Sequence, residues 1–523
     1  MTAKSSPLSL TRRRLLGGAA ALAGASMFAP HLGSAQTPEG ATPAANVTPG
    51  GTLKATLGAE PDTLDPHKGN TLFDRDVWDQ LYDALVDDDI LSGVRGALAE
   101  SWDSPDATAW TFKLRQGLTF HDGSPVTSAE VKWSVERVQN PDTGASGALG
   151  RIVTHVKTID TPDANTIVFT LDAPNAAFPM QMADIKILPQ NFDETKPVGA
   201  GPFTFGEWVR NQHVLVNKFA NYYRQGEPYL DAIEFRPTPD EDQKVVLLQT
   251  NQVDFTDTIP LPRAQEVQKG GQLQVFTIPE GVSPSSYFMP VNCRKPPLDD
   301  PRVRQAMNFA IDRQALLDAT FGFGTIKSNV VPPKHWAFNP DALSFNKRDV
   351  DQAKKLLADA GQSGGFDIEL KHITSRAEYT TIAQIVQANL ADVGINVKIL
   401  PEEIGVWVDE VLNKHDFQWG LTGIIPAYDP DYMMSRYDIN DADGASMGWE
   451  NDEYQQLLVQ GRAAVEQEER KKIYFRAQEI AQEAAPGFII NERPILYGAS
   501  MAVQGFRPDI RQHTHFTTVW LKK

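Results

Sequence analysis

The sequence predicts an α/β fold with at least two lobes, and three observations support this prediction. After removal of an export signal, about 488 residues remain, which is more than one hydrophobic core usually supports. Strand-like runs dominate between residues 110 and 240, whereas residues 366–400 have the pattern of a strand, a helix and a second strand. We therefore expect a β-rich first part and an α/β second part.

The first 35 residues have the order of regions that is typical of a secretory signal. Residues 12–16 (RRRLL) precede an apolar run that ends at Ala29, and residues 33–35 (GSA) suit a signal peptidase. The arginines before leucines resemble a twin-arginine signal, and no cysteine follows that would carry a lipid anchor. Residues 1–35 are thus expected to be a signal peptide and residues 36–51 a flexible leader, with the mature protein in the periplasm. The alternative is a basic tail beside a buried helix.

The charge balance restricts the partners of the mature chain. Residues 1–35 contain four basic residues and no acidic one, which leaves 45 Lys and Arg against 67 Asp and Glu, a net charge of −22. This balance argues against nucleic acid or an anionic membrane as a partner. No later apolar run approaches the roughly twenty residues that span a bilayer. Cys293 is the only cysteine, so an internal disulfide is excluded.

In the first half, the alternation of residues 110–120 predicts an antiparallel hairpin that turns at Gln116-Gly117. Thr127 with Glu130 three positions later is a capping box that begins a helix. Further strands are predicted at residues 166–171, 213–219 and 232–237.

In the second half, Asp300-Pro301 predicts the start of a helix that ends by Gly322. A second helix is predicted between Asp349 and Gly361. The strand at residues 366–370, the helical stripe that ends at Gly394 and the strand at residues 395–400 form a β-α-β unit.

Six runs, in order, resemble those of one protein family. Residues 98–138 contain LAESW, FKLRQG and FHDGSP and resemble the extracytoplasmic solute-binding proteins of the peptide/nickel ABC-importer family (family 5, similar to dipeptide- and oligopeptide-binding proteins). The other matching runs are residues 64–67 (LDPH), 199–203 (GAGPF), 222–231 (NYW.G.PYLD-like), 297–306 (PF.D.RVRQA-like) and 427–431 (AYDPD).

The resemblance implies a two-lobed flytrap with an extra β-rich subdomain inserted in the first lobe. Lobe 1 would comprise residues 52–290 plus 490–523, with the insertion at about 90–190, and lobe 2 would comprise residues 291–489. Such a protein, as a monomer without a cofactor, closes on a small molecule or short peptide and delivers it to an inner-membrane ABC permease. No catalytic residue and no metal ligand are assigned.

The resemblance also implies which residues bind the two ends of a peptide ligand. Peptide-binding members pair the ligand's ammonium with an Asp three positions before the late "DP", where this chain has Pro426. Asp429 could replace that acid or could stay in the turn before Pro430. Arg376 lies near the position of a carboxylate-binding arginine, and the alternative is a solvated residue at a helix start.

Four further residues are assigned to the site. Asn70 and Leu72 follow the LDPH run, in a segment that lines the cleft in the family. Thr422 and Ile424 fall where the family pairs main chain with an extended ligand. Trp449 is the preferred aromatic residue for the cleft because it follows a predicted Gly/Asp/Ser-rich loop at 440–448, although core packing is the alternative.

The sequence does not determine which solute the protein binds. A peptide or peptide-like solute is preferred, and an opine, an oligosaccharide or a metal chelate is the alternative. His513 and His515 would share one strand face and could bind a metal; His67, His335, His372 and His415 are looser candidates. A secreted hydrolase is a distant alternative, because no nucleophile motif or metalloprotease motif is present.

Overall fold

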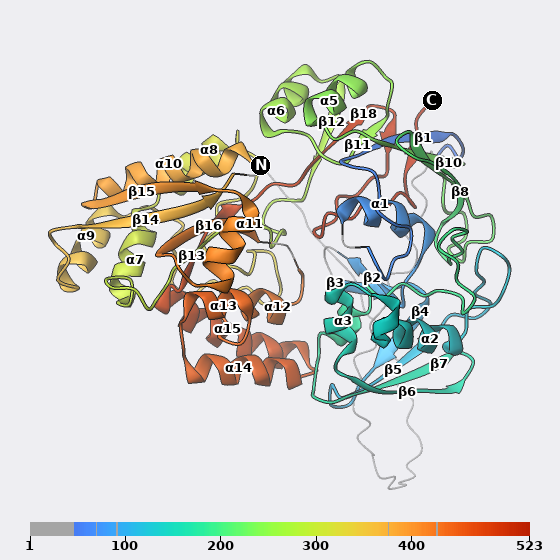
Figure 1. Ribbon diagram of the computed structural model, residues 1–523, viewed down its shortest axis with the longest axis horizontal. Coiled ribbons are helices and arrows are strands. Elements are labelled where there is room, and N and C mark those ends of the chain that lie inside the picture. Colours follow the sequence, from blue (N-terminus) through green and yellow to red (C-terminus); the bar gives the residue numbers. More distant parts are fainter. Residues whose placement is uncertain (1–46, 70, 90–92, 375, 425–426) are drawn as a thin grey trace, which may run out of the picture. The chain divides into compact units, whose positions relative to one another are not determined.

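The computed structural model describes residues 47–523 except residues 70, 90–92, 375 and 425–426 (Figure 1). The predicted signal peptide, most of the predicted leader, Asn70 and Pro426 lie outside the described residues. Within the described part of the chain, the strands form sheets of seven, five and four strands and two two-stranded ribbons. The ribbons pair β2 (Val86–Asp89) with β3 (Gly93–Gly96), and β19 (Val503–Gln504) with β20 (Trp520–Leu521).

The seven-stranded sheet combines strands from both ends of the described chain. Its strands are β1 (Thr52–Leu57), β8 (Phe203–Val209), β9 (His213–Lys218), β10 (Ala232–Pro237), β11 (Phe255–Thr256), β12 (Leu273–Thr277) and β18 (Leu496–Ser500). They lie in the order β12-β18-β11-β1-β10-β9-β8. Helices α1 (Leu72–Leu81), α5 (Glu241–Gln249) and α6 (Leu261–Gly270) accompany them. α1 buries Val77, Trp78 and Leu81 in the core of this sheet. The strand predictions at 213–219 and 232–237 are confirmed, the former to within one residue.

The four-stranded sheet contains the first predicted motif. Its strands are β4 (Ala99–Asp103), β5 (Ala109–Leu114), β6 (Val156–Asp163) and β7 (Thr166–Leu171), in the order β4-β5-β7-β6, so the strand predicted at 166–171 is confirmed. α2 (Ser128–Gln139) and α3 (Gly147–Val153) pack nearby, with the short segments η1 (Pro141–Thr143) and α4 (Phe178–Gln181). The predicted capping box of α2 is confirmed: Thr127 and Glu130 bond each other's backbone N–H groups.

The predicted hairpin at residues 110–120 is wrong in its pairing. The alternation of β5 is confirmed, because Trp110, Phe112 and Leu114 are buried. However, β5 pairs with β4 and β7, and the residues after the turn form only a bridge between Thr119 and Pro125. β7, which is distant in sequence, pairs with β5 along residues 109–113, whereas Leu118 and Phe120 after the turn are buried in the same core without pairing with β5.

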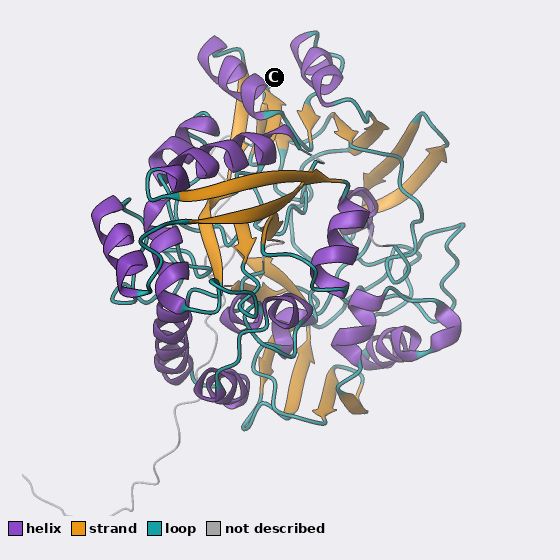
Figure 2. Cartoon of the chain, turned by 60° about the vertical axis from the view of Figure 1, so that its left-hand side comes forward, coloured by secondary structure: helices purple, strands orange, loops and turns teal. Residues whose placement is uncertain are grey.

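The five-stranded sheet forms the centre of the second part. Its strands are β13 (Ser286–Pro290), β14 (Phe366–Ile373), β15 (Ile395–Glu402), β16 (Trp419–Ile424) and β17 (Gly487–Glu492), in the order β15-β14-β16-β13-β17. α10 (Ala377–Ala391) connects the parallel strands β14 and β15 and packs against them, which confirms the predicted β-α-β unit (Figure 2).

Alternate side chains of this sheet enter two different cores. Tyr287 and Met289 pack with α7 (Pro301–Ala310), α9 (Val350–Asp359) and α10, whereas Phe288 between them packs with the helices that follow β16. This is expected of strands that are buried on both faces. The remaining helical segments are α8 (Arg313–Ala319), α11 (Ile404–Trp407), the π-helical η2 (Val408–Asn413), α12 (Pro430–Ser435), α13 (Ala442–Met447), α14 (Asp452–Ala463) and α15 (Gln467–Ala484).

The single helix predicted from Asp300 to Gly322 is wrong, because two helices occupy this range. Asp300 caps α7 as predicted, but α7 ends at Ala310 and α8 begins at Arg313. The carboxylate of Asp312 between them accepts hydrogen bonds from the backbone N–H groups of Gln314 and Ala315, both at 3.0 Å. An Asp in this position favours a new helix start over continuation of the old helix.

The chain passes between the seven-stranded and five-stranded sheets twice within the described residues. β12 leads to β13 through residues 278–285, and β17 leads to β18 through residues 493–495. The two segments are joined where the backbone N–H of Arg493 donates to the carbonyl oxygen of Ser285 at 3.3 Å. Among the described residues, no helix combines the length and the apolar character needed to cross a membrane.

The LDPH run holds helix α2 in place. The Arg137 guanidinium donates to both carboxylate oxygens of Asp65, at 2.6 and 3.1 Å, and to Nδ1 of His67 at 2.8 Å. The other ring nitrogen of His67 lies 2.9 Å from the carbonyl oxygen of Lys186. Because Asp65 and His67 are fully buried and satisfied within the protein, their role in this structure is architectural.

His121 joins two other runs of the resemblance, FHDG and GAGPF. Its Nδ1 accepts the backbone N–H of Gly199 at 3.2 Å, so Nε2 carries the proton and donates to the carbonyl oxygen of Gly201 at 3.1 Å. Gly199 and Gly201 pass so close to α1 that an added Cβ would lie 2.0 and 2.6 Å from backbone atoms of Leu81. Burial lowers the pKa of His121 to about 4.

We expect Asp312→Ala to destabilise the protein by about 1 kcal/mol, because the start of α8 loses its cap. Chemical denaturation followed by circular dichroism measures this change. Asp299→Ala removes an exposed acid whose side chain makes no described hydrogen bond, and it should leave the free energy of unfolding nearly unchanged. Equal effects of the two substitutions would contradict the capping role.

We also expect His121 to make the protein less stable on acidification. The unfolded ring takes up a proton near pH 6.5 and the folded ring only near pH 4, so its contribution is complete above pH 6.5 and is lost as the pH falls to 4. One pKa unit corresponds to about 1.4 kcal/mol, so the loss for this one ring reaches about 3 kcal/mol.

The measurement is the free energy of unfolding of wild type and His121→Gln at pH 7 and pH 4.5. The variant should lose less stability between the two pH values than the wild type, whereas His155→Gln, at an exposed histidine, should keep the wild-type difference. An unchanged pH dependence in His121→Gln would refute the expectation.

Candidate ligand-binding cleft

A cavity of about 790 Å³ is lined by residues of both the seven-stranded and the five-stranded parts. One wall comes from α1, from the start of α5 and from residues 257–262 after β11. The other comes from Ala319 and Phe321 at the end of α8 and from the start of α10. Arg493 and Pro494, which connect β17 to β18, lie between them. The volume is in the range of sites that enclose a small molecule.

Arg376 stands at the start of α10 and lines the cavity. It occupies the N-cap position, but no side chain caps this helix end. The N–H groups at a helix start carry partial positive charge and attract anions. The exposed guanidinium of Arg376 makes no described hydrogen bond and has no described carboxylate within 4.0 Å. This end of the cavity therefore offers positive charge that the described protein does not neutralise.

Arg493 adds a second guanidinium to the same cavity. Its Nε is buried and has no hydrogen-bond acceptor among the described residues, and none of their carboxylates forms an ion pair with it. Sequence reasoning missed Arg493. Its place directly after the predicted return to lobe 1 near residue 490 is the only signal that could have indicated it.

Two tyrosines pack beside these arginines. The rings of Tyr287 and Tyr379 meet edge to face with centroids 5.8 Å apart. Burial raises the pKa of both hydroxyl groups, with Glu378 adding to the increase and Arg493 and Arg376 opposing it. Both hydroxyls are therefore neutral at physiological pH and can donate a hydrogen bond.

The opposite wall carries acidic groups. Asp257 accepts a hydrogen bond from Lys244 at 2.8 Å and one from the Thr56 hydroxyl at 3.0 Å, while Asp76 accepts one from the Thr514 hydroxyl at 2.6 Å. Burial raises the pKa of Asp76 well above its ordinary value, and the charge of Asp257 raises it further. A cation that entered next to Asp76 would favour its ionised form. The wall opposite the two arginines thus carries Asp76 and Asp257, with Lys244 beside them, and Glu378 lies on the arginine side.

The predicted site residues occupy different places relative to this cavity. Leu72 and Arg376 both line it, and Leu72 is unusually exposed for leucine, at 40%. Thr422 and Ile424 lie on β16, whose pairing with β14 ends at Leu421, so β16 continues past the end of its neighbour. The Ile424 side chain packs in a core, which leaves only its backbone for a ligand.

Trp449 packs in the hydrophobic core between the five-stranded sheet and α12–α15, and it does not line the cavity. It is 9% exposed, and its ring meets that of Tyr454 at 5.0 Å. The stretch before it, taken as a loop at 440–448, contains helix α13, so the reason for preferring Trp449 is removed. Asn70 and Pro426 lie outside the described residues.

Asp429, the alternative partner for a ligand amine, is already occupied. It caps α12 through the N–H of Asp431, and Arg470 donates to its two carboxylate oxygens at 2.8 and 2.9 Å. Both members of this pair are buried. The alternative that Asp429 stays in the turn before Pro430 is therefore confirmed.

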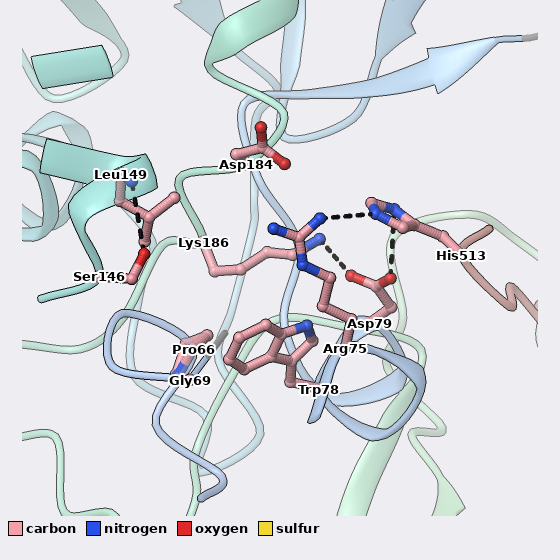
Figure 3. A pocket seen from close by; sticks show the side chains of 10 residues that line it. All are labelled: Pro66, Gly69, Arg75, Trp78, Asp79, Ser146, Leu149, Asp184, Lys186 and His513. Atoms are coloured by element: carbon pink, nitrogen blue, oxygen red, sulfur yellow. Dashed lines mark hydrogen bonds and ion pairs between the residues drawn. The ribbon is translucent and has the colours of Figure 1, made fainter. Parts of the chain in front are cut away.

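A second, much smaller cavity is lined by Arg75, Trp78 and Asp79 of α1 and by His513, one of the two histidines considered above as metal ligands (Figure 3). Its space of about 10 Å³ is near the minimum for one water molecule. Asp79 forms an ion pair with Lys186 at 2.7 Å. Burial alone would raise the pKa of Asp79, but the charge of Lys186, the largest opposing cause, holds it well below the usual range.

His513 and His515 do not lie on a strand, so that prediction is wrong. α1 holds the segment instead, because the Gln80 amide donates to the backbone carbonyl of Thr514. Ligand atoms of Asp79, His513 and His515 lie within 4.8 Å of one another. However, Arg75 donates to Nε2 of His513 at 3.2 Å, which leaves the proton on the nitrogen that faces Asp79 (Figure 3). Burial lowers the pKa of His513 to about 3, so its ring is neutral and takes part by hydrogen bonding beside the Asp79–Lys186 ion pair.

Comparisons with known proteins agree with the architecture. The family model "Bacterial extracellular solute-binding proteins, family 5 Middle" matches residues 93–445. The chain is similar to the glutathione-binding protein GsiB of Escherichia coli (strain K12), with 27% identity over 481 residues that cover 86% of this chain and 90% of GsiB.

This chain is also similar to two proteins of known structure. The periplasmic binding protein DppA from Helicobacter pylori in complex with peptide STSA is 25% identical, covers 91% of this chain and 99% of its own, and has a TM-score of 0.71. AgaA from A. tumefaciens R10 in complex with agropinic acid is 29% identical, covers 90% and 99%, and also has a TM-score of 0.71. The chain therefore belongs to family 5 of the bacterial extracellular solute-binding proteins and has their two-lobed α/β fold.

Proposed function

We propose that this substrate-binding component of an ABC importer captures a peptide or peptide-like solute in the periplasm. Closure of the two lobes around the solute would then present it to an inner-membrane permease. The difference in the solute's affinity for the closed and open forms is the free energy that drives closure. Export by a twin-arginine signal, without a lipid anchor, and function as a monomer complete the proposal.

The charges of the cleft are the observation that carries this proposal. Arg376 and the uncapped start of α10 suit a carboxylate, and Asp76 on the opposite wall suits an ammonium group. A zwitterionic chain matches this separation of charges. Residues 422–424 of β16 extend past the part of β16 that pairs with β14, and the main chain of an extended ligand could pair there as an added strand.

A non-peptide acid is the second candidate. Pro426 provides no carboxylate at the family's amine-binding position, and Asp429 is occupied by Arg470. A carboxylate-bearing solute without a free amine would need only the arginine end of the cleft. The similarity to AgaA in complex with agropinic acid supports this opine-like alternative.

Native mass spectrometry of protein purified without denaturation tests both candidates. A retained peptide supports the first candidate, and a retained non-peptide acid supports the second. The purified solute should raise the melting temperature and be recovered unchanged, because a ligand that binds only the folded state stabilises it. Recovery of a hydrolysed product would contradict a binding role.

Arg376→Gln should weaken binding of the dipeptide Ala-Leu by about tenfold or more, because the ligand carboxylate loses a charge-assisted hydrogen bond. Isothermal titration calorimetry measures the change in Kd. Binding of Ala-Leu amide should be weaker than that of Ala-Leu in the wild type and should change little in the variant.

The matched control is Arg151→Gln, which removes the same charge from an exposed position on α3. It should bind Ala-Leu as the wild type does. If Arg376→Gln kept the preference for the free acid over the amide, Arg376 would not bind the carboxylate.

Pro426→Asp should create or strengthen binding of dipeptides with a free amine, because it restores an acid at the family's amine-binding position. Pro426→Asn controls for loss of the proline ring without adding charge. Calorimetry with Ala-Leu and N-acetyl-Ala-Leu should show a gain for the free amine only in Pro426→Asp. If the charge changed the affinity for neither peptide, the assignment of Pro426 to the site would be wrong.

A further inference from the structure

We infer that Arg493 and Arg376 form a two-arginine subsite that binds a ligand with two acidic groups, its terminal carboxylate and a second one. The inference rests on the proposed peptide-binding function and narrows its ligand class to acidic peptides. Arg493 lies in the connection between β17 and β18, so the second acidic group would contact the segment that joins the two lobes.

The lack of partners for Arg493 is the first argument. Three other buried guanidinium groups have partners: Arg137 in Asp65, Arg470 in Asp429, and Arg304 in backbone carbonyl oxygens at 2.6 to 3.1 Å. Arg263, Arg313 and Arg436 also have a buried Nε without an acceptor, but another nitrogen of each guanidinium has a partner. Arg493 has neither kind of partner among the described residues, although its Nε is buried. A buried donor without an acceptor is costly, so a ligand oxygen there would remove that cost.

The surroundings of Arg493 give the second argument. The Tyr287 hydroxyl is also buried without a described partner, and the Tyr287 side chain is 1% exposed. Gly423 makes room for this cluster, since an added Cβ would lie 2.6 Å from the Tyr379 hydroxyl and 3.2 Å from Nε of Arg493. The unsatisfied Nε of Arg493, next to the Tyr379 hydroxyl and a glycine on β16, indicates a place for a polar ligand group.

The charge of this wall gives the third argument. Arg376, Arg493 and the positive end of α10 face the cavity, and Glu378 is the acidic residue nearest to them on α10. Glu378 makes no ion pair with either arginine within 4.0 Å, although all three line the cavity. A carboxylate that binds the planar fork of one guanidinium in the bidentate manner uses both of its oxygens. Two arginines therefore favour two acidic groups.

The test compares Ala-Glu with Ala-Gln, which have nearly the same shape and differ in one carboxylate. By calorimetry, wild type should bind Ala-Glu about tenfold more tightly than Ala-Gln, a ratio that corresponds to about 1.4 kcal/mol. Arg493→Gln should abolish this preference and keep binding of Ala-Gln. Arg493→Lys, which keeps the charge but not the fork, should keep part of the preference. Arg151→Gln should keep all of it.

Three outcomes would contradict the inference. Equal affinities of wild type for Ala-Glu and Ala-Gln, or an undiminished preference in Arg493→Gln, would mean that a single carboxylate serves both arginines; the proposed peptide function would then stand. Absence of binding by both dipeptides and by Ala-Leu would instead overturn the peptide function and this inference with it. Melting temperatures of the Arg493 variants near that of the wild type would show that any loss reflects the site.

Discussion

The pairing of buried carboxylates with buried cations is the constraint on which the rest of this structure depends. Asp65 with Arg137, Asp429 with Arg470 and Asp79 with Lys186 each join segments distant in sequence. A buried ion pair is expensive to break, because the remaining partner stays charged in a poorly solvated place. The Asp79–Lys186 pair holds α1, which forms part of one wall of the cleft, whereas Arg376 and Arg493 line the cleft without such a partner among the described residues.

The runs that relate this chain to its family are therefore mostly architectural. His121 ties FHDG to GAGPF, Arg137 ties LDPH to α2, and Asp429 of the DPD run caps α12. None of the three provides a free group to a solute. This explains how members that bind different solutes can share the same runs: the shared residues satisfy one another, and the cleft differs.

The cleft itself depends on how the five-stranded sheet ends. β14 stops at Ile373 and the chain turns into α10, whereas β16 continues to Ile424. The carboxyl end of a strand and the start of a helix thereby meet at one place, which is where α/β proteins commonly bind ligands. Arg376 is positioned by this geometry, and the connection that carries Arg493 runs beside it.

The sequence by itself determined the elements whose signals are local: the capping box at Thr127, the helix start at Asp300 and the β-α-β unit predicted from 366 to 400. Only the tertiary structure decided the partners of β5, the cores that enclose Trp449, and the convergence of Arg493 and Asp76 on the same cavity. The physical reason is that periodicity and capping act within a few residues, whereas strand pairing, burial and the neutralisation of charge depend on segments brought together from opposite ends of the chain.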